Sequence, residues 1–341
     1  MRALVVNAGS TSLKVSMLDP PHTETFDTLG AALPHAADVD VVIHRVVHGG
    51  TRTSPARLDD ALVAELRALV EVAPLHQPAA LDLIDECRAA CPGVLQYACF
   101  DTSFHTTVPP AARTYALPKR WRERVVAYGF HGISHAWSSR QVSTAAPDVG
   151  RLVVAHLGGG ASLCAVRDGR SVMTTMGFTP LDGLVMATRS GAIDPGAVLW
   201  MVEHADADED VGRVLEHESG LAGLCGDADM REVLQRSDRG DRDAELAIDV
   251  YVHRLVTSIG ACVAALGGID ALAFTGGVGE RAPKVRARTT ARLEWLGVAI
   301  DESTPAESVR EVTADGAPVR TFVVEAREDL EMAAQVAPLL A

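Results

Sequence analysis

Residues 151–166 read RLVVAHLGGGASLCAV, which is an apolar run, a glycine-rich break and a second apolar run. This pattern is typical of a strand, a tight turn and a second strand. Residues 2–18 have the same design, with a polar break at residues 7–12. One such unit opens each half of the chain, which indicates a duplicated fold.

A third apolar strand is predicted at residues 271–274, and it runs into the turn TGGVGE of residues 275–280. A helix is expected from Pro283, because proline suits a first helical turn. Residues 20–40 look irregular. Apolar residues at helical spacing predict further helices over residues 58–70, 78–90 and 244–266. The mixture of strands and helices predicts an α/β protein.

The composition restricts the function classes. The 341 residues include 45 acidic and 31 basic side chains, for a formal net charge of −14, and the length suits two domains. Such an acidic protein is unsuited to binding nucleic acid or an anionic membrane through its overall field. The N-terminal apolar run is too short for a signal peptide, and we expect a cytoplasmic protein without a membrane span. The cysteines lack a CxxC pair and are expected to be reduced, buried thiols.

Glycine-rich turns follow three of the predicted strands. Small residues in a turn let backbone N–H groups approach a phosphate without interference from a Cβ atom. The chain has no GxxxxGK[ST] motif, which excludes a P-loop, and no GxGxxG after a strand, which weakens a dinucleotide-binding interpretation. Phosphate or nucleotide contact is therefore favoured over plain structural turns.

Two arginines lie among apolar and glycine residues, Arg45 in HRVVHGG and Arg189 in TRSG. A guanidinium that cannot reach water needs an anionic partner, and its planar fork suits a carboxylate or a phosphate. Each arginine alone is equally consistent with a structural ion pair. Together with the glycine-rich turns they favour an anionic substrate.

Histidines and acidic residues supply the remaining candidates. His131 and His135 are four residues apart, as in a helical metal site, but Gly129 and Gly132 argue against a helix there. Asp101 follows an apolar strand, where functional acids and helix caps both occur. Glu328 is equally consistent with the first turn of a helix.

Nine short motifs extend the pattern over nearly the whole chain. They are NAGSTSLK (7–14), HRVVHGG (44–50), APLH (73–76), CFDTSFH (99–105), YGFHG (128–132), MGFTPLDG (176–183), TRSG (188–191), FTGGVGE (274–280) and EDL (328–330). In this order they resemble the acetate kinase family, a branch of the superfamily of acetate and sugar kinases, heat-shock chaperones and actin.

The resemblance implies a fold of two similar RNase H-like, actin-type βββαβαβα domains that flank a nucleotide cleft. The N-terminal domain would comprise residues 1–103 and 329–341, and the nucleotide-binding domain residues 104–328. The first domain is expected to be shortened, because residues 20–40 are fewer than the family has at this place. The resemblance also implies a homodimer.

The activity implied is reversible, direct in-line transfer of the ATP γ-phosphoryl group to acetate, or also to propionate, which gives acetyl phosphate and ADP. Mg²⁺ is the expected cofactor, with Mn²⁺ as a substitute. One alternative is a catalytically impaired, nucleotide-binding regulatory member. It is motivated by the short first domain and by Gly159 and Arg281, which both replace family asparagines. A sugar kinase fits poorly, since it needs a catalytic base and a polar pocket.

Roles follow from the resemblance, motif by motif. The catalytic residues implied are Arg45, Asp101, His131 and Arg189, with both arginines holding the carboxylate and the migrating phosphoryl group. The substrate pocket implied comprises Arg45, Val47, Leu75, Phe130 and Pro180. The metal side would be formed by Asn7 and Glu328. The ATP contacts implied are Lys14, His156, Gly158, Gly159, Gly160, Asp229, Met230, Arg231, Gly277, Val278, Gly279, Glu280 and Arg281.

Overall fold

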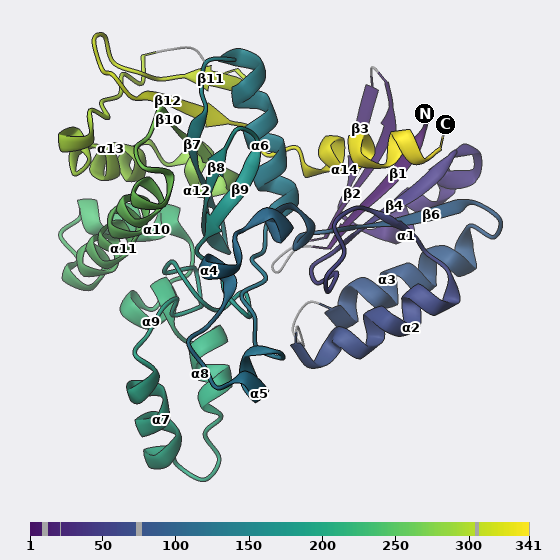
Figure 1. The fold of residues 1–341 in the computed structure, drawn as a ribbon, viewed down its shortest axis with the longest axis horizontal. Helices are drawn as coiled ribbons and strands as arrows, with labels where there is room; N and C mark the ends of the chain where they lie inside the picture. Colours follow the sequence, from purple (N-terminus) through teal and green to yellow (C-terminus); the bar gives the residue numbers. More distant parts are fainter. Residues whose placement is uncertain (9–12, 21, 73–76, 304–306, 341) are drawn as a thin grey trace. The chain divides into compact units, whose positions relative to one another are not determined.

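The computed structural model describes residues 1–8, 13–20, 22–72, 77–303 and 307–340. The chain forms two compact units, which are coloured along the sequence in Figure 1. Unit 1 consists of Met1–Thr107, Tyr128–Trp137 and Arg327–Ala341, and unit 2 of Val108–Ala127 and Ser138–Ala326. Unit 1 thus includes residues 104–107, 128–137 and 327–328, which were expected to belong to the second domain.

The sheet of unit 1 has the strand order β3-β2-β1-β4-β6-β5. Strands β1, β2 and β3 are antiparallel neighbours, whereas β4 runs parallel to β1 and β6 runs parallel to β4. The strands are β1 (Ala3–Ala8), β2 (Leu13–Asp19), β3 (His22–Phe26), β4 (Val41–Val46), β5 (Ala56–Arg57) and β6 (Leu95–Phe100).

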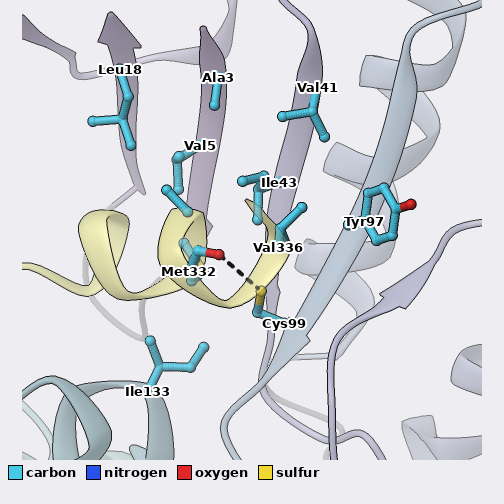
Figure 2. Packing of buried hydrophobic residues seen from close by; sticks show 11 residues of the cluster. Ala3, Val5, Leu18, Val41, Ile43, Tyr97, Cys99, Ile133, Met332 and Val336 are labelled. Atoms are coloured by element: carbon cyan, nitrogen blue, oxygen red, sulfur yellow. Dashed lines mark hydrogen bonds between the residues drawn. The ribbon is translucent and has the colours of Figure 1, made fainter. Parts of the chain in front are cut away.

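Helices cover both faces of this sheet. Alternate residues of a strand point to opposite faces, and in β1 the side chains on both faces are apolar and buried. Ala3 and Val5 pack with Met332 of the C-terminal helix, and Ile133 joins the same cluster (Figure 2). Leu4 and Val6 pack on the other face. The helical elements of unit 1 are α1 (Leu29–Ala32), η1 (Leu33–Asp38), α2 (Asp60–Ala68), η2 (Leu69–Val72), α3 (Gln77–Ala90), η3 (Ser103–Thr107), the start of α6 (Gly132–Ala145), α14 (Glu328–Val336) and η5 (Ala337–Leu339).

The sheet of unit 2 repeats the plan, with the order β11-β12-β10-β7-β8-β9. Strands β7, β8 and β9 are antiparallel, and β10 runs parallel to both β7 and β12. Strand for strand, β7, β8, β9, β10 and β12 correspond to β1, β2, β3, β4 and β6. The predicted duplication is confirmed. The strands are β7 (Arg151–Leu157), β8 (Ala161–Arg167), β9 (Arg170–Thr174), β10 (Ala271–Thr275), β11 (Val309–Glu311) and β12 (Arg320–Val324).

One helix of the described residues, α11, is long and apolar enough to span a membrane by length and composition. It packs against β7, β8 and β9 and against α9, α10 and α13, so it is a helix over the second sheet. The helices of unit 2 are α4 (Pro110–Arg113), α5 (Lys119–Arg122), the rest of α6, α7 (Pro195–His204), α8 (Val211–His217), α9 (Gly220–Cys225), α10 (Met230–Asp238), α11 (Arg242–Leu266), α12 (Gly276–Arg281), α13 (Pro283–Ala291) and η4 (Glu294–Leu296).

Most predicted elements are confirmed, including the helices at residues 58–70, 78–90 and 244–266 and the helix from Pro283. All six cysteines are buried and free. Residues 20–40 were wrongly predicted to be irregular. They contain β3, whose sequence HTETF is almost fully exposed and lacks the apolar alternation that marks a strand.

A second correction concerns the glycines near His131. They were taken to exclude a helix, yet α6 begins at Gly132. A Cβ atom at Gly132 would lie 2.1 Å from the carbonyl oxygen of Asp101. Glycine is present here because two backbones meet, which is a tertiary requirement that also fits the first residue of a helix.

Candidate active site

Three polar side chains meet at the carboxyl ends of neighbouring parallel strands in unit 1. Asn7 lies near the end of β1 and Arg45 near the end of β4, and Asp101 directly follows β6. The strands are adjacent in the order β1-β4-β6. In open α/β sheets this edge is where ligands bind. The sheet order therefore assembles residues that are 38 and 56 positions apart in the chain.

Arg45 is the centre of this cluster. Its Nε donates to both carboxylate oxygens of Asp101 (3.2 and 3.1 Å), and Nη2 donates to Oδ2 at 2.7 Å. Nη1 donates to Oδ1 of Asn7 at 3.0 Å and lies 3.7 Å from Oε2 of Glu328. The side chain of Asn7 in turn donates to Glu328 at 2.6 Å. The sequence-predicted residues Asn7, Arg45, Asp101 and Glu328 are thus brought together.

The charges of this cluster are coupled. Burial by itself lowers the pKa of Arg45, but the carboxylates of Asp101 and Glu328 outweigh burial and raise it above its ordinary value. Burial raises the pKa of Asp101, and the guanidinium of Arg45 opposes that rise. Because a guanidinium remains protonated in proteins, Arg45 carries a permanent positive charge. Its hydrogen bonds to Asp101 and Asn7 fix the orientation of the guanidinium plane.

His131 is attached to the same cluster through the backbone. The N–H of Gly132 donates to the carbonyl of Asp101 at 2.9 Å, and the N–H of Ile133 interacts with the Asp101 side chain. His131 itself has a φ of 57°, in the left-handed region that non-glycine residues rarely adopt. Such strain persists where the surroundings hold the backbone, often at functional sites.

Gln77 is a supporting residue to which the sequence patterns gave no role. Its buried amide accepts from the N–H of His48 at 3.2 Å and donates to the carbonyl of His48 at 3.1 Å. It therefore fixes the turn after β4, next to Val47. Val47 and Phe130, predicted pocket residues, are buried in unit 1, and Leu75 lies outside the described residues. No motif in a single sequence marks such an amide.

Arg189 and Pro180 are brought together in unit 2. Arg189 is 7% exposed; its Nη1 donates to the carbonyl of Pro180 at 3.2 Å and contacts the sulfur of Met186 at 3.5 Å. Burial lowers the pKa of Arg189, and the charge of Glu216 opposes that change. The backbone around it is tight, because a Cβ atom at Gly220 would lie 2.3 Å from the carbonyl of Met186.

The predicted phosphate turn also lies in unit 2, between β7 and β8. The N–H of Gly158 donates to the carbonyl of Gly160 at 2.9 Å, and the carbonyl of Gly159 accepts from Ala187 at 3.1 Å. His156 at the end of β7 is the register partner of Thr275 on β10. The turn therefore lies beside both the Arg189 segment and the start of α12.

The other predicted nucleotide residues lie in or at the start of two helices of unit 2, except Lys14, which lies on a strand of unit 1. Residues 277–281 lie within α12, which starts at Gly276 with a φ of 77°. Asp229 caps α10 and bonds the side chain of Arg231, which lowers the pKa of Asp229. Met230 is buried. Lys14 lies in unit 1, on β2, as the register partner of Asn7.

The predicted metal side offers one carboxylate, that of Glu328, which is 14% exposed. The amide oxygen of Asn7 accepts from Arg45, and its amide nitrogen donates to Glu328. Within the described part of the chain, no group of three or more histidine, cysteine or acidic residues is positioned to hold a metal ion. Mg²⁺ typically takes one or two carboxylates and completes its shell with water and phosphate. The single carboxylate of Glu328 fits that ion and does not fit a zinc site.

The comparisons with known proteins agree with this geometry. The model of the acetokinase family matches residues 23–334. The chain belongs to the acetokinase family. Among similar proteins of this family, the acetate kinase of Streptomyces avermitilis is 47% identical over 324 residues, which covers 92% of this chain and 79% of that protein. The acetate kinase of Leifsonia xyli subsp. xyli is 42% identical over 385 residues, covering 97% of each.

Solved structures of acetokinases share the fold. A propionate kinase from Francisella tularensis superimposes with a TM-score of 0.90 at 32% identity, covering 98% of both chains. The acetate kinase of Porphyromonas gingivalis gives a TM-score of 0.88 at 28% identity and full coverage of both. The prediction of two actin-type domains is confirmed. The alignment with the Leifsonia acetate kinase spans 385 positions, compared with the 341 residues of this chain.

Buried histidines in unit 1 predict a steep acid sensitivity. Burial lowers the pKa of His44, His48 and His105 to about 4, whereas the unfolded value is about 6.5. Between pH 6.5 and 4 the unfolded chain binds protons that the folded chain does not, so stability falls as the pH falls. The loss reaches roughly 3 kcal/mol per histidine at pH 4.

Urea unfolding at pH 7.5, 6.5, 5.5 and 5.0 measures this dependence. His105, whose Nε2 bonds the carbonyl of Phe130 at 2.9 Å, is the histidine to replace. The variant His105→Gln keeps a polar group and loses the titration, so its stability should depend less on pH than that of the wild type. Equal slopes in the two proteins would contradict the assignment.

Proposed function

We propose that this protein catalyses the reversible transfer of the γ-phosphoryl group of ATP to acetate, which yields acetyl phosphate and ADP. Membership of the acetokinase family supports the reaction class. The single structural observation that carries the proposal is the buried Arg45, held by Asp101 and Asn7 at the carboxyl ends of parallel strands. A charged site that had lost its function would not be expected to keep this arrangement.

The chemistry suits these residues. A carboxylate is already a nucleophile, so the reaction needs no general base, and catalysis consists of positioning and charge neutralisation. Asp101 and Asn7 engage three of the five N–H groups of the Arg45 guanidinium. Two N–H groups then serve to hold the acetate carboxylate and the transferring phosphoryl oxygens. The resemblance assigns Arg189 to the same step and His131 to hydrogen bonding in the transition state.

Mg²⁺ is proposed as the resident cation. Glu328 would hold it through its carboxylate, with Asn7 on the same side. The ion supplies positive charge that neutralises phosphate oxygens as negative charge moves between them. Glu328 is also 3.7 Å from Arg45, so the same carboxylate that holds the ion would orient the guanidinium.

A hydroxamate assay tests the proposed function. The purified protein is incubated with ATP and Mg²⁺ and with formate, acetate, propionate or butyrate, and hydroxylamine traps any acyl phosphate. We expect product with acetate and also with propionate, because one methylene in an apolar pocket discriminates by only about 1–3 kcal/mol. Omission of ATP is the control. No acyl hydroxamate with any of the four acids, from a folded protein, would refute the function.

We also propose that the protein is a cytoplasmic homodimer that pairs through α7. No residue of this helix is buried, although it is rich in apolar side chains; Leu199, Trp200 and Val202 are 64%, 60% and 60% exposed. Exposed apolar patches of this kind mark interaction sites. Both copies of a symmetric dimer would bury the same patch.

Replacement of Trp200 by glutamate should convert the dimer into a monomer, because it places a charge in the centre of the apolar contact. Light scattering after size-exclusion chromatography measures the mass. Trp295, which is 73% exposed in η4, offers the matched control Trp295→Glu, which should remain dimeric. A dimeric Trp200→Glu protein would rule out α7 as the interface.

A further inference from the structure

Glu280 belongs to the segment to which the resemblance assigns ATP contacts, yet its carboxylate bonds the protein's own backbone. Its Oε1 accepts a hydrogen bond from the backbone N–H of Ala326 at 3.0 Å. A carboxylate that faced the phosphates of ATP would repel them. Bonded to the main chain instead, it ties α12 to the residues after β12.

Ala326 occupies a special place in the chain. It is the last residue of unit 2, and Arg327 begins the segment that returns to unit 1. Glu328, which contacts Asn7 and Arg45, follows two residues later. Two residues of chain span at most about 7 Å. A displacement of the Ala326 backbone therefore also displaces the backbone of Glu328.

The helix α12 is itself held firmly. Arg286, 2% exposed, donates from Nη1 to the carbonyls of Gly279 and Glu280, at 2.7 and 2.9 Å. Its guanidinium also bonds both carboxylate oxygens of Glu302, at 2.6 and 2.8 Å. A buried charge with this many partners is costly to displace. The Gly279–Glu280 backbone is therefore held together with Arg286 and Glu302, and the Glu280 carboxylate links this group to Ala326.

We infer that Glu280 is a positioning residue that couples nucleotide binding at α12 to the backbone of residues 326–328, and so to Glu328. The inference rests on the proposed ATP-dependent function and on the ATP contacts that the resemblance assigns to residues 277–281. It assigns the Glu280 carboxylate to the protein's own chain instead of to the adenosine. Because the contact is a hydrogen bond to an oxygen atom, an amide oxygen in the same place can replace it.

Hydrogen exchange of the full chain, with and without ADP and in the absence of acetate, tests the coupling. In the wild type, ADP should slow exchange in residues 276–281 and also in residues 325–330. Glu280→Gln should keep both effects. Glu280→Ala should keep the effect at 276–281, while the slowing at 325–330 falls by about fivefold, which corresponds to the loss of one hydrogen bond.

Asp210→Ala is the matched control, because Asp210 also accepts from a backbone N–H, that of Gly212 at 2.9 Å, at the start of α8. It should leave both ADP effects unchanged. Full ADP-dependent slowing at 325–330 in Glu280→Ala, or its loss in Glu280→Gln, would overturn the inference. So would a wild type in which ADP affects residues 276–281 alone.

The two proposals fail in different ways. A wild type that shows both ADP effects but forms no acyl hydroxamate would refute the proposed reaction and uphold the coupling. A wild type in which ADP slows exchange nowhere would refute the nucleotide site, and the coupling with it.

Discussion

Replacement of Arg45 by alanine should lower kcat by about 10³-fold or more, which is the scale for an arginine that stabilises phosphoryl transfer. The same change should lower the free energy of unfolding by about 3–5 kcal/mol, because it leaves the 1%-exposed carboxylate of Asp101 buried without its partner. Hydroxamate formation and urea unfolding measure the two effects on one preparation.

Arg45→Lys separates charge from geometry. An ammonium group restores positive charge beside Asp101 but cannot bond both of its oxygens and Asn7 in one plane. We expect most of the stability to return and kcat to remain at least about 100-fold below the wild type. A lysine variant with near-normal kcat would show that Arg45 acts through its charge alone, and a near-normal alanine variant would exclude it from catalysis.

Gly132→Ala should strongly destabilise unit 1. The added Cβ atom would lie 2.1 Å from the carbonyl of Asp101 and 3.0 Å from Cβ of Phe104. Since one neighbour is backbone, the start of α6 has to move away, which breaks the Gly132–Asp101 hydrogen bond. The expected loss is about 2–4 kcal/mol of unfolding free energy, with a fall in kcat because His131 moves with Gly132.

Gly30 provides the matched control, because it lies in α1 and a Cβ atom there meets nothing within 4 Å. Gly30→Ala should be neutral or raise the unfolding free energy by up to about 1 kcal/mol, since alanine favours a helix. Thermal or urea unfolding of the two variants makes the comparison. Equal stabilities would mean that the backbone contact at Gly132 does not constrain the fold.

Much of unit 1 and unit 2 could be predicted from local patterns. Short continuous apolar runs on either side of a turn marked β1, β2, β7 and β8, and the helical spacing of apolar residues marked α11. The edge strand β3 could not be found in this way, because its side chains face solvent on both sides. An exposed strand has no hydrophobic pattern to detect, and only its register with β2 defines it.

The candidate site divides in the same way. Local pattern alone made Arg45 stand out, because its charge lies among apolar and glycine residues, whereas Asp101 and Glu328 were selected only through the family motifs. The folded chain alone shows that the sheet order β1-β4-β6 gathers these residues around one guanidinium. The folded structure alone also shows that the Gln77 amide bonds the backbone of His48 and that the Glu280 carboxylate accepts from the N–H of Ala326. A local pattern reports which side chains are buried, whereas a hydrogen bond between distant residues exists only once the strands are in register.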